Sequence, residues 1–376
     1  MSSPRLVKIV TAISLGVVFA SLLSWVGLNG VVGSISHNDV FGGLQTRAVK
    51  ESKSLNFLVV GSDSRSGLTK TELKKLRVGS TKTAAGGRSD TMFLVHISKD
   101  RSNAVIVSIP RDTLATIPSH INSSGKLVEG PVQSKINAAF AWGGAPLLIQ
   151  TLESKSKLHI DHYVEINFAG FTKIVDSLGG IEVCSKTAIN DPKSHLVMSS
   201  GVHTLQGAQA LAYVRTREFD GTGDIGRMKR QQAFVSSVFH KVTSAGILLN
   251  PTALVKVFNA SIGSISTDPG FGSNDLLSLL QNLGNLSASK VRTLTVPLSN
   301  SNGYAPGIGS VVMWDSVRAR NLFDRLNKDQ VIFDVVRPSA SASSTSSSSA
   351  AKPSKPRLIE KFDAKVVSSN LCAPKR

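Results

Sequence analysis

Between residues 53 and 336, short apolar runs alternate with helix-like patterns. The runs "FLVV", "TMFLVHI", "AVIVSI" and "VRTLTV" are typical of strands, whereas "SNDLLSLLQNL" and the long segment beginning at Asp224 are typical of helices. Because the strands are apolar almost throughout, they indicate a sheet that is covered on both faces. The pattern predicts an α/β fold, a three-layer α-β-α domain with a mixed central sheet.

A longer apolar run, Ile9 to Leu28, precedes this domain and follows two cationic residues, Arg5 and Lys8. About 20 apolar residues are enough to cross the hydrocarbon core of a bilayer. We therefore predict one transmembrane helix over residues 9–29, with residues 1–8 in the cytoplasm and the rest of the chain outside the cell membrane. A cleaved signal peptide is the alternative interpretation.

The polar residues 30–52 are predicted to form an extracytoplasmic stalk, and the globular domain is predicted to span residues 53–336. Residues 337–356 are rich in Ser and contain Pro, as is typical of a flexible linker. A tail, residues 357–376, ends the chain. Its apolar residues Leu358, Ile359 and Phe362 suggest that it packs on another part of the protein.

Charge and cysteine content narrow the classes of partner and site. The chain has 43 Lys and Arg against 25 Asp and Glu, a formal charge of +18, which suits an anionic membrane or a phosphate-bearing substrate. An extracytoplasmic domain argues against nucleic acid. Two cysteines, Cys184 and Cys372, exclude a disulfide scaffold and a Cys-based zinc site. Outside the reducing cytosol we expect these two to form a disulfide, the alternative being two free thiols.

Three polar clusters occur at the ends of apolar strands, and each contains an arginine and an aspartate. They are Asp63 with Arg65 in "GSDSR", Arg88 with Asp90 in "GGRSDT", and Arg111 with Asp112 in "SIPRD". Any one of them has an ordinary explanation, because Gly, Ser and Asp form turns and cap helices. Turns do not require arginine, so we expect the three clusters to converge on one rim of the sheet.

Two further segments supply cationic and polar residues. In "LAYVRTRE", an extended backbone would place Arg215 and Arg217 on one side, where paired guanidinium groups suit a diphosphate; charges on an edge strand are the alternative. In "DIGRMKRQQAFVSSVFHKV", helical spacing directs Arg227 and Gln231 toward the rim. The same spacing directs Arg230 toward solvent.

The order of motifs resembles that of the LytR-CpsA-Psr family of cell-wall glycopolymer ligases. The motifs are "GSDSR", "GGRSDTM", "SIPRD", "KINAAFAWGG", "DSLGGIEV", "GVHTLQGAQALAYVRTR" and "DIGRMKRQQ". The resemblance implies an anchored α-β-α enzyme that takes a polymer from an undecaprenyl-pyrophosphate carrier and joins it to a peptidoglycan hydroxyl through a phosphodiester. "GGIEVC" with a late cysteine favours the actinobacterial branch. Teichoic acid, capsule and arabinogalactan all remain open as the polymer.

The resemblance also implies roles for individual residues. Asp63 and Asp90 match the Mg²⁺ ligands, with Asp90 our first choice and Asp63 our second for the base that deprotonates the acceptor. The pyrophosphate-binding set is Arg88, Arg111, Arg215, Arg217, Arg227 and Gln231, with Lys135 as a further candidate. Arg111 is also assigned to catalysis, since arginine neutralises charge on a transferring phosphoryl group. Asn167 departs from the family, which usually has Asp there.

The carrier lipid requires an apolar slot, which we expect between the sheet and its helices. Phe140, Trp142, Phe168 and Phe171 could line it; the alternative is that some of them are ordinary core residues, and none is assigned to the site. Two other functions remain open: a non-catalytic protein that binds polyprenyl phosphate or wall polymer, and a membrane-bound transcriptional attenuator.

Overall fold

A computed structural model describes most of the predicted domain. The described residues are 36–44, 46–65, 68–79, 89–122, 124–221, 223–244, 257, 264–271, 279, 286, 288–330, 332, 362 and 364–366. Within them, no helix is long and apolar enough to cross a membrane. The predicted span 9–29, the linker 337–356 and the predicted helix around residues 273–283 fall outside the described residues, apart from residue 279.

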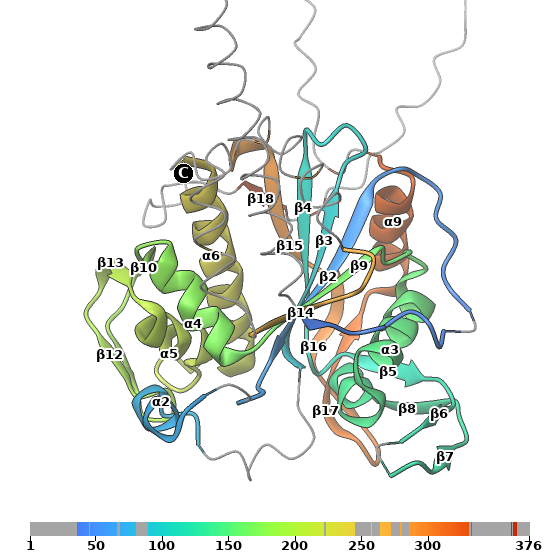
Figure 1. The fold of residues 1–376 in the computed structure, drawn as a ribbon, viewed down its shortest axis with the longest axis horizontal. Helices are drawn as coiled ribbons and strands as arrows, with labels where there is room; N and C mark the ends of the chain where they lie inside the picture. The colour runs from blue at the N-terminus through green and yellow to red at the C-terminus, as the bar shows by residue number, and fades with distance from the viewer. Residues whose placement is uncertain are drawn as a thin grey trace, which may run out of the picture.

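The core of the described fold is a mixed eight-stranded sheet (Figure 1). Its strands, in spatial order, are β1 (Ser36–His37), β14 (Ile265–Thr267), β9 (His162–Ile166), β2 (Leu55–Ser62), β3 (Ser89–Ile97), β4 (Ala104–Ile109), β15 (Val291–Thr295) and β18 (Lys365–Val366). The pairs β1–β14, β9–β2 and β4–β15 are parallel, and the others are antiparallel. The predicted mixed sheet is confirmed.

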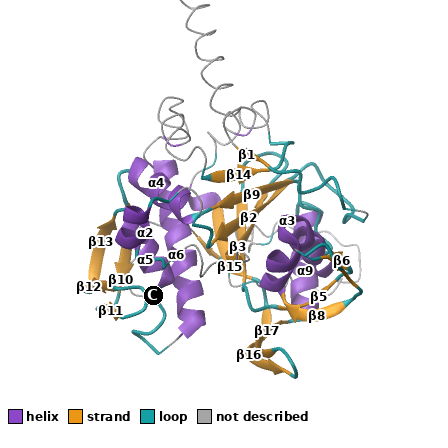
Figure 2. Ribbon diagram, turned by 60° about the horizontal axis from the view of Figure 1, so that its bottom comes forward, coloured by secondary structure: helices purple, strands orange, loops and turns teal. Residues whose placement is uncertain are grey.

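Helices cover both faces of this sheet (Figures 1 and 2). α4 (Phe168–Ser177), α5 (Gly207–Arg215) and α6 (Gly223–Ser244) lie on one face, and α3 (Ile136–Ser156) and α9 (Ser316–Asn327) lie on the other. Alternate residues of β2 enter the two cores: Leu58 and Val60 pack in the cluster that includes α3 and α9, and Phe57 packs in a cluster on the α6 face. Burial on both faces explains why the strands are apolar throughout.

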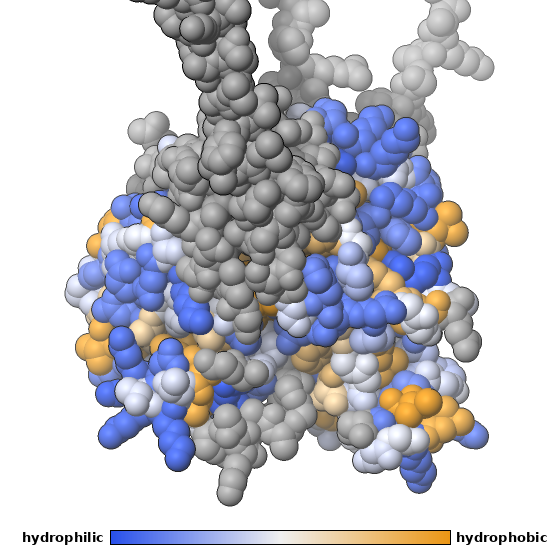
Figure 3. Space-filling model, viewed as in Figure 1, coloured by the Kyte–Doolittle hydropathy of each residue, from blue (hydrophilic) through white to orange (hydrophobic). Residues whose placement is uncertain are grey.

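Smaller elements surround the three layers. They are α2 (Lys70–Leu76), the 3-10 helix η3 (Ala288–Lys290), and the antiparallel pairs β5 (Leu114–Ile117) with β8 (Val132–Lys135), β6 (His120–Ile121) with β7 (Leu127–Val128), β10 (Ile181–Ser185) with β13 (Gly201–Leu205), β11 (Ile189–Asp191) with β12 (Leu196–Met198), and β16 (Leu298–Ala305) with β17 (Gly309–Trp314). Ile121 and Leu127 on the β6–β7 hairpin are exposed, and Figure 3 shows a hydrophobic patch in this region.

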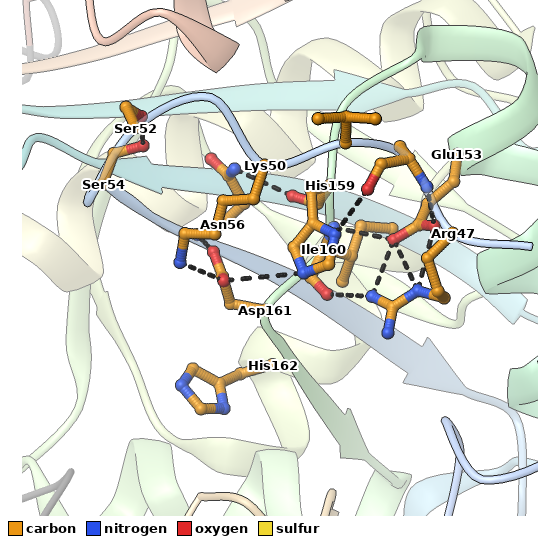
Figure 4. A network of polar contacts seen from close by, with 12 residues as sticks. Arg47, Lys50, Ser52, Ser54, Asn56, Glu153, His159, Ile160, Asp161 and His162 are labelled. Atoms are coloured by element: carbon orange, nitrogen blue, oxygen red, sulfur yellow. Dashed lines mark hydrogen bonds and ion pairs between the residues drawn. The ribbon is translucent and has the colours of Figure 1, made fainter.

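The segment before β2 packs on the domain where it is described. Figure 4 shows Arg47 reaching Glu153 of α3, whose carboxylate is 2% exposed and also accepts hydrogen bonds from the backbone N–H groups of Ala48 and Ile160. Val40 is buried in the core, and β1 extends the sheet. The predicted stalk is therefore wrong over its described part, because residues from Ser36 onward belong to the folded domain rather than to a free spacer.

Part of the C-terminal tail also packs on the domain. Phe362 is 6% exposed within the core that includes α9, and β18 pairs with the edge of β15. Leu358 and Ile359 lie outside the described residues. Cys184 in β10 is disulfide-bonded. Because Cys372 lies outside the described residues, its pairing with Cys184 stays a prediction.

Candidate active site

The three predicted clusters meet at one end of the sheet. Because β3 runs antiparallel to both β2 and β4, the end of β2, the start of β3 and the end of β4 lie on the same rim. Asp63 follows the last residue of β2, and Arg111 comes two residues after β4. Gly61 pairs with Thr91 and Ser62 pairs with Ser89, so Asp90 is an extra, bulged residue on β3. Arg88 and the side chain of Asp90 lie outside the described residues.

Arg65 stabilises the chain beside Asp63. Its guanidinium group donates hydrogen bonds to the carbonyl oxygen of Val78, at 2.8 Å, and to that of Asp63, at 3.3 Å. These contacts tie the end of β2 to the segment after α2. Arg65 therefore fixes the backbone that presents the carboxylate of Asp63.

Asp224, in the first turn of α6, is surrounded by three arginines of the predicted pyrophosphate set. Its carboxylate lies 3.1 Å from Nη2 of Arg227, 3.3 Å from Nε of Arg217 and 3.9 Å from Nη2 of Arg111. The side chain of Asp224 is half exposed, so an incoming anion can reach the same guanidinium groups. The arrangement brings together residues from the β4 end, the loop after α5, and α6.

A second carboxylate extends this cationic group. Asp112 lies 3.3 Å from Nε of Arg111 and 3.2 Å from Nζ of Lys135, the residue before α3. Within the group of Arg111, Arg217, Arg227 and Lys135 with Asp112 and Asp224, cations exceed carboxylates by two. A surplus of this size suits a diphosphate, whose oxygens match the paired donors of arginine.

Arg215 and Arg217 are not on one extended segment, and this prediction is wrong. Arg215 is the last residue of α5, and Thr216 turns to extended backbone. The Ala, Gln and Leu residues upstream favour a helix. The loop after the helix is held by Asp191, whose buried carboxylate accepts hydrogen bonds from the backbone N–H groups of Arg217 and Glu218.

The four backbone hydrogen bonds to Asp191 also control its ionisation. Burial alone would raise the pKa of this carboxyl, but the N–H groups of Glu218, Ser194, Arg217 and Lys193 outweigh burial and lower the pKa to about 2. Asp191 is thus a fixed anion at neutral pH. Through this anion, the β11–β12 hairpin holds the backbone of Arg217.

Arg227 and Gln231 face the rim, as the helical spacing predicts. Arg227 is 6% exposed, and Nε2 of Gln231 donates to the carbonyl oxygen of Val214 at 3.2 Å. Both residues line a small cavity of about 60 Å³ at the rim, together with Arg111, Asp112 and Asp224. We call this cavity the charged pocket.

The prediction that Arg230 faces solvent is wrong. Arg230 is 9% exposed, and its guanidinium donates to the carboxylate of Asp220 at 2.8 Å and to the carbonyl oxygen of Thr216 at 2.7 Å. It also lies over the ring of Phe219. The helical pattern gives the direction of Arg230 but not the loop, residues 216–220, that covers that side of α6.

An apolar cavity of about 230 Å³ lies between the sheet and α4, α5 and α6. Its lining is mainly Val, Ile, Leu and Phe side chains, and it shares Arg227 and Gln231 with the charged pocket. Arg215 also lines the cavity, with its guanidinium 5.6 Å from the ring of Phe168. The predicted slot for an apolar ligand is therefore present beside the cationic group.

Two of the four aromatic residues predicted for this slot line it. Phe168 and Phe171 line the apolar cavity. Phe140 and Trp142 are on α3, where Phe140 packs against the core and Trp142 lines another cleft. Asn167 also lines the cavity, and its Oδ1 caps α4 by accepting a hydrogen bond from the N–H of Gly170. Asn supplies this cap as well as Asp does.

The predicted magnesium site rests on two aspartates. Among the described residues, no group of three or more His, Cys, Asp or Glu side chains could hold a metal ion. Asp63 follows β2 and Asp90 is on β3, and both lie next to the same register shift. Two carboxylates fit Mg²⁺, which keeps water and phosphate oxygens as its other ligands.

Three acidic residues of the site were not assigned from the sequence: Asp112, Asp191 and Asp224. Asp224 carried one local signal, since it lies three residues before Arg227 on the same helix face. Asp191 carried none for its link to the site, because its partner Arg217 lies 26 residues later in the sequence.

The sequence is similar to those of known proteins. The probable cell wall biosynthesis protein LcpB of Corynebacterium glutamicum is 35% identical over 271 residues, covering 72% of this chain and 60% of LcpB. The polyisoprenyl-teichoic acid–peptidoglycan teichoic acid transferase TagU of Halalkalibacterium halodurans is 36% identical over 179 residues, covering 46% of this chain and 55% of TagU. The matches thus span little more than half the length of these relatives.

The fold is shared with solved structures as well. The LytR-Csp2A-Psr enzyme from Actinomyces oris superimposes with a TM-score of 0.57 at 23% identity, covering 78% of this chain and 96% of that one. The family model LytR_cpsA_psr matches residues 32–327. Since this match covers most of the chain, the protein belongs to the LytR_cpsA_psr family.

Proposed function

We propose that the protein is a membrane-anchored phosphotransferase of cell wall assembly. It moves a glycopolymer from an undecaprenyl-pyrophosphate, or other polyprenyl-pyrophosphate, carrier to a peptidoglycan hydroxyl outside the cell membrane. The observation that carries the proposal is the apolar cavity with Arg227 and Gln231 at its charged end, beside Arg111, Arg217 and Asp224. The printed name of TagU, a polyisoprenyl-teichoic acid–peptidoglycan transferase, supports this class of reaction.

In the proposed reaction, the acceptor oxygen attacks the phosphorus that carries the glycan. A new P–O bond forms, the bond from this phosphorus to the bridging oxygen breaks, and polyprenyl phosphate leaves. The hydroxyl proton passes to a rim carboxylate, for which Asp90 is our first choice and Asp63 our second. Arg111, Arg217 and Arg227 neutralise the charge on the transferring group, and Arg215 binds where the lipid meets the phosphates.

Magnesium, which Asp63 and Asp90 would hold, supplies charge neutralisation on the phosphate oxygens when bound. The two residues come from different strands, so loss of either should weaken the site. Neither Arg65 nor Asp191 touches the substrate in this scheme. Both position residues that do.

The test is a transfer assay with the purified full-length protein in detergent, labelled polyprenyl-pyrophosphate-linked glycan and uncross-linked peptidoglycan. We expect transfer with Mg²⁺ and none with a chelator. Asp63→Ala and Asp90→Ala should each slow transfer about a thousandfold, since metal-based charge stabilisation is worth several kcal/mol. The exposed acid Glu182 on β10 provides a control, and Glu182→Ala should transfer normally.

Two outcomes would contradict the proposal. If transfer persists after both aspartates are replaced, Asp63 and Asp90 do not form a magnesium site that the reaction requires. Labelled donor that binds but never releases polyprenyl phosphate would favour a non-catalytic lipid-binding protein.

A further inference from the structure

A third cavity, of about 380 Å³, opens beside the charged pocket. It is lined by Arg111, Asp112, Lys135, Asn137, Ala138, Ala141 and Trp142. We call it the Trp142 cleft. It shares Arg111 and Asp112 with the charged pocket, whereas the apolar cavity shares Arg227 and Gln231 with that pocket. The charged pocket therefore borders both larger spaces.

The indole ring of Trp142 is held in place from two directions. It stacks on the imidazole of His120, with ring centroids 5.6 Å apart and planes within 7°. It also packs on a small core cluster that includes Ile117 and Leu147. Trp142 is the last residue before the α3 backbone leaves helical geometry at Gly143 and Gly144, and the positive φ of Gly144 allows this kink. A rigid, partly exposed aromatic face is the result.

Four other side chains of the cleft are polar: Arg111, Asp112, Lys135 and Asn137. Asp112 and Lys135 pair at 3.2 Å, and the amide of Asn137 lies two residues further along. A sugar ring has one face of C–H groups and a rim of hydroxyls, so it fits a flat aromatic face bordered by carboxylate, ammonium and amide groups. An extended lipid would not satisfy these polar groups.

The position of the cleft indicates which sugar it takes. Helices α4, α5 and α6, which line the apolar cavity, lie on one face of the sheet (Figure 1). Elements β8 and α3, which supply residues to the Trp142 cleft, lie on the other side. In phosphoryl transfer, the attacking and leaving oxygens lie roughly in line on opposite sides of phosphorus. If the lipid phosphate leaves toward the apolar cavity, the nucleophile enters from the Trp142 cleft.

We propose that the Trp142 cleft binds the acceptor, a sugar ring of a glycan strand stacked on Trp142, and directs its hydroxyl past Arg111 and Asp112. This inference rests on the proposed function. It adds a location and a recognition residue for the acceptor.

The test varies a soluble, uncross-linked peptidoglycan tetrasaccharide at fixed labelled donor, with the full-length protein. We expect Trp142→Ala to raise KM for the tetrasaccharide at least tenfold, Trp142→Phe to restore part of the loss, and Asn137→Ala to raise KM severalfold. The dissociation constant of the donor, measured without acceptor, should stay within twofold. Tyr304→Ala is the matched control, because Tyr304 is an exposed aromatic residue outside the cleft.

Each outcome decides the proposal. If KM for the tetrasaccharide is unchanged in both Trp142→Ala and Asn137→Ala, the proposal is overturned. It is also overturned if these variants bind the donor more weakly while KM for the acceptor is unchanged, a result that would assign the cleft to the donor glycan. If circular dichroism shows that Trp142→Ala does not fold, KM for the tetrasaccharide in Asn137→Ala and Trp142→Phe tests the proposal instead. Failure of the proposed function would differ, because the unmodified protein would then show no transfer.

Discussion

Arg227 and Arg230, three residues apart on α6, are both buried but have different roles. Arg227 pairs with Asp224 and lines the charged pocket, where a phosphate can replace part of that pairing. Arg230 is occupied by Asp220, Thr216 and Phe219, all in the loop that carries Arg217. One arginine therefore serves the ligand, and the other stabilises a loop of the site.

Replacing Arg230 should destabilise the protein. Arg230→Ala removes one donor from the carboxylate of Asp220 and one from the buried carbonyl of Thr216, which we expect to lower the free energy of unfolding by about 2 to 3 kcal/mol. Urea denaturation followed by circular dichroism measures this. Lys229→Ala, one residue away and exposed, is the control and should change stability by less than about 0.5 kcal/mol. Equal stability of the two variants would contradict the role assigned to Arg230.

Asp191 should make stability depend on acid pH. Because its pKa is lowered to about 2 in the folded protein, its contribution is fully present above its ordinary pKa of 3.8 and is lost as the pH falls from about 4 toward 2. Asp191→Asn should lower the free energy of unfolding at pH 7 by about 2 kcal/mol and flatten this acid-dependent loss. Urea denaturation at pH 7, 4 and 2.5 tests both effects. A variant with an unchanged acid profile would show that other carboxyl groups dominate.

At the scale of elements, the apolar cavity depends on the close approach of α4 and α5. Gly207 begins α5 against α4, and its N–H donates to Asp176 at 2.8 Å. A Cβ atom at this position would lie 2.5 Å from the carbonyl oxygen of Thr172 and 2.8 Å from its Cα. Only glycine allows this contact between the two helices.

Gly207→Ala should therefore push the two helices apart. We expect a loss of about 2 to 3 kcal/mol in stability and weaker binding of a polyprenyl phosphate, since Phe171 of α4 and Leu211 of α5 line the cavity. Thermal unfolding and a lipid-binding assay measure the two effects. Gly43→Ala is the control, because a Cβ atom there has no neighbour within 4 Å. If Gly207→Ala binds the lipid normally, the cavity does not depend on the close contact between α4 and α5.

At the scale of the whole molecule, both ends of the domain are closed by segments distant in sequence. Residues before β2 bind α3 through Arg47 and Glu153, and β18 with Phe362 closes the opposite edge of the sheet. The tail lies next to α9, where the guanidinium of Arg325 is 5.9 Å from the ring of Phe362. The C-terminal segment thus contributes to the core of the domain.

Phe362→Ala should lower the free energy of unfolding by about 3 kcal/mol, because it leaves a cavity in that core. Phe362→Leu should restore most of the loss. Thermal unfolding compares the two variants with the unmodified protein. If Phe362→Ala unfolds at the unmodified temperature, the tail contributes no stability.

The predicted disulfide between Cys184 and Cys372 would secure the same tail covalently. Titration of thiols in denatured, unreduced protein should find none. Two free thiols would contradict the pairing.

The sequence by itself determined the fold class and the location of the rim. Continuous apolar strands require helices on both faces of a sheet, and Asp63, Asp90 and Arg111 stand at the ends of such strands, which predicts a common rim. Helical spacing also directed Arg227 and Gln231 toward the charged pocket. These features follow from periodicity along the chain, which neighbouring residues encode.

Only the tertiary structure decided which segments cover these elements. The burial of Arg230 depends on a loop beginning 14 residues earlier, the position of Arg217 depends on Asp191, and the rigidity of Trp142 depends on His120. Arg215 is the last residue of helix α5 because the Ala, Gln and Leu residues before it favour a helix. Local periodicity gives the direction of a side chain, whereas its burial and partners depend on chain segments that only folding brings together.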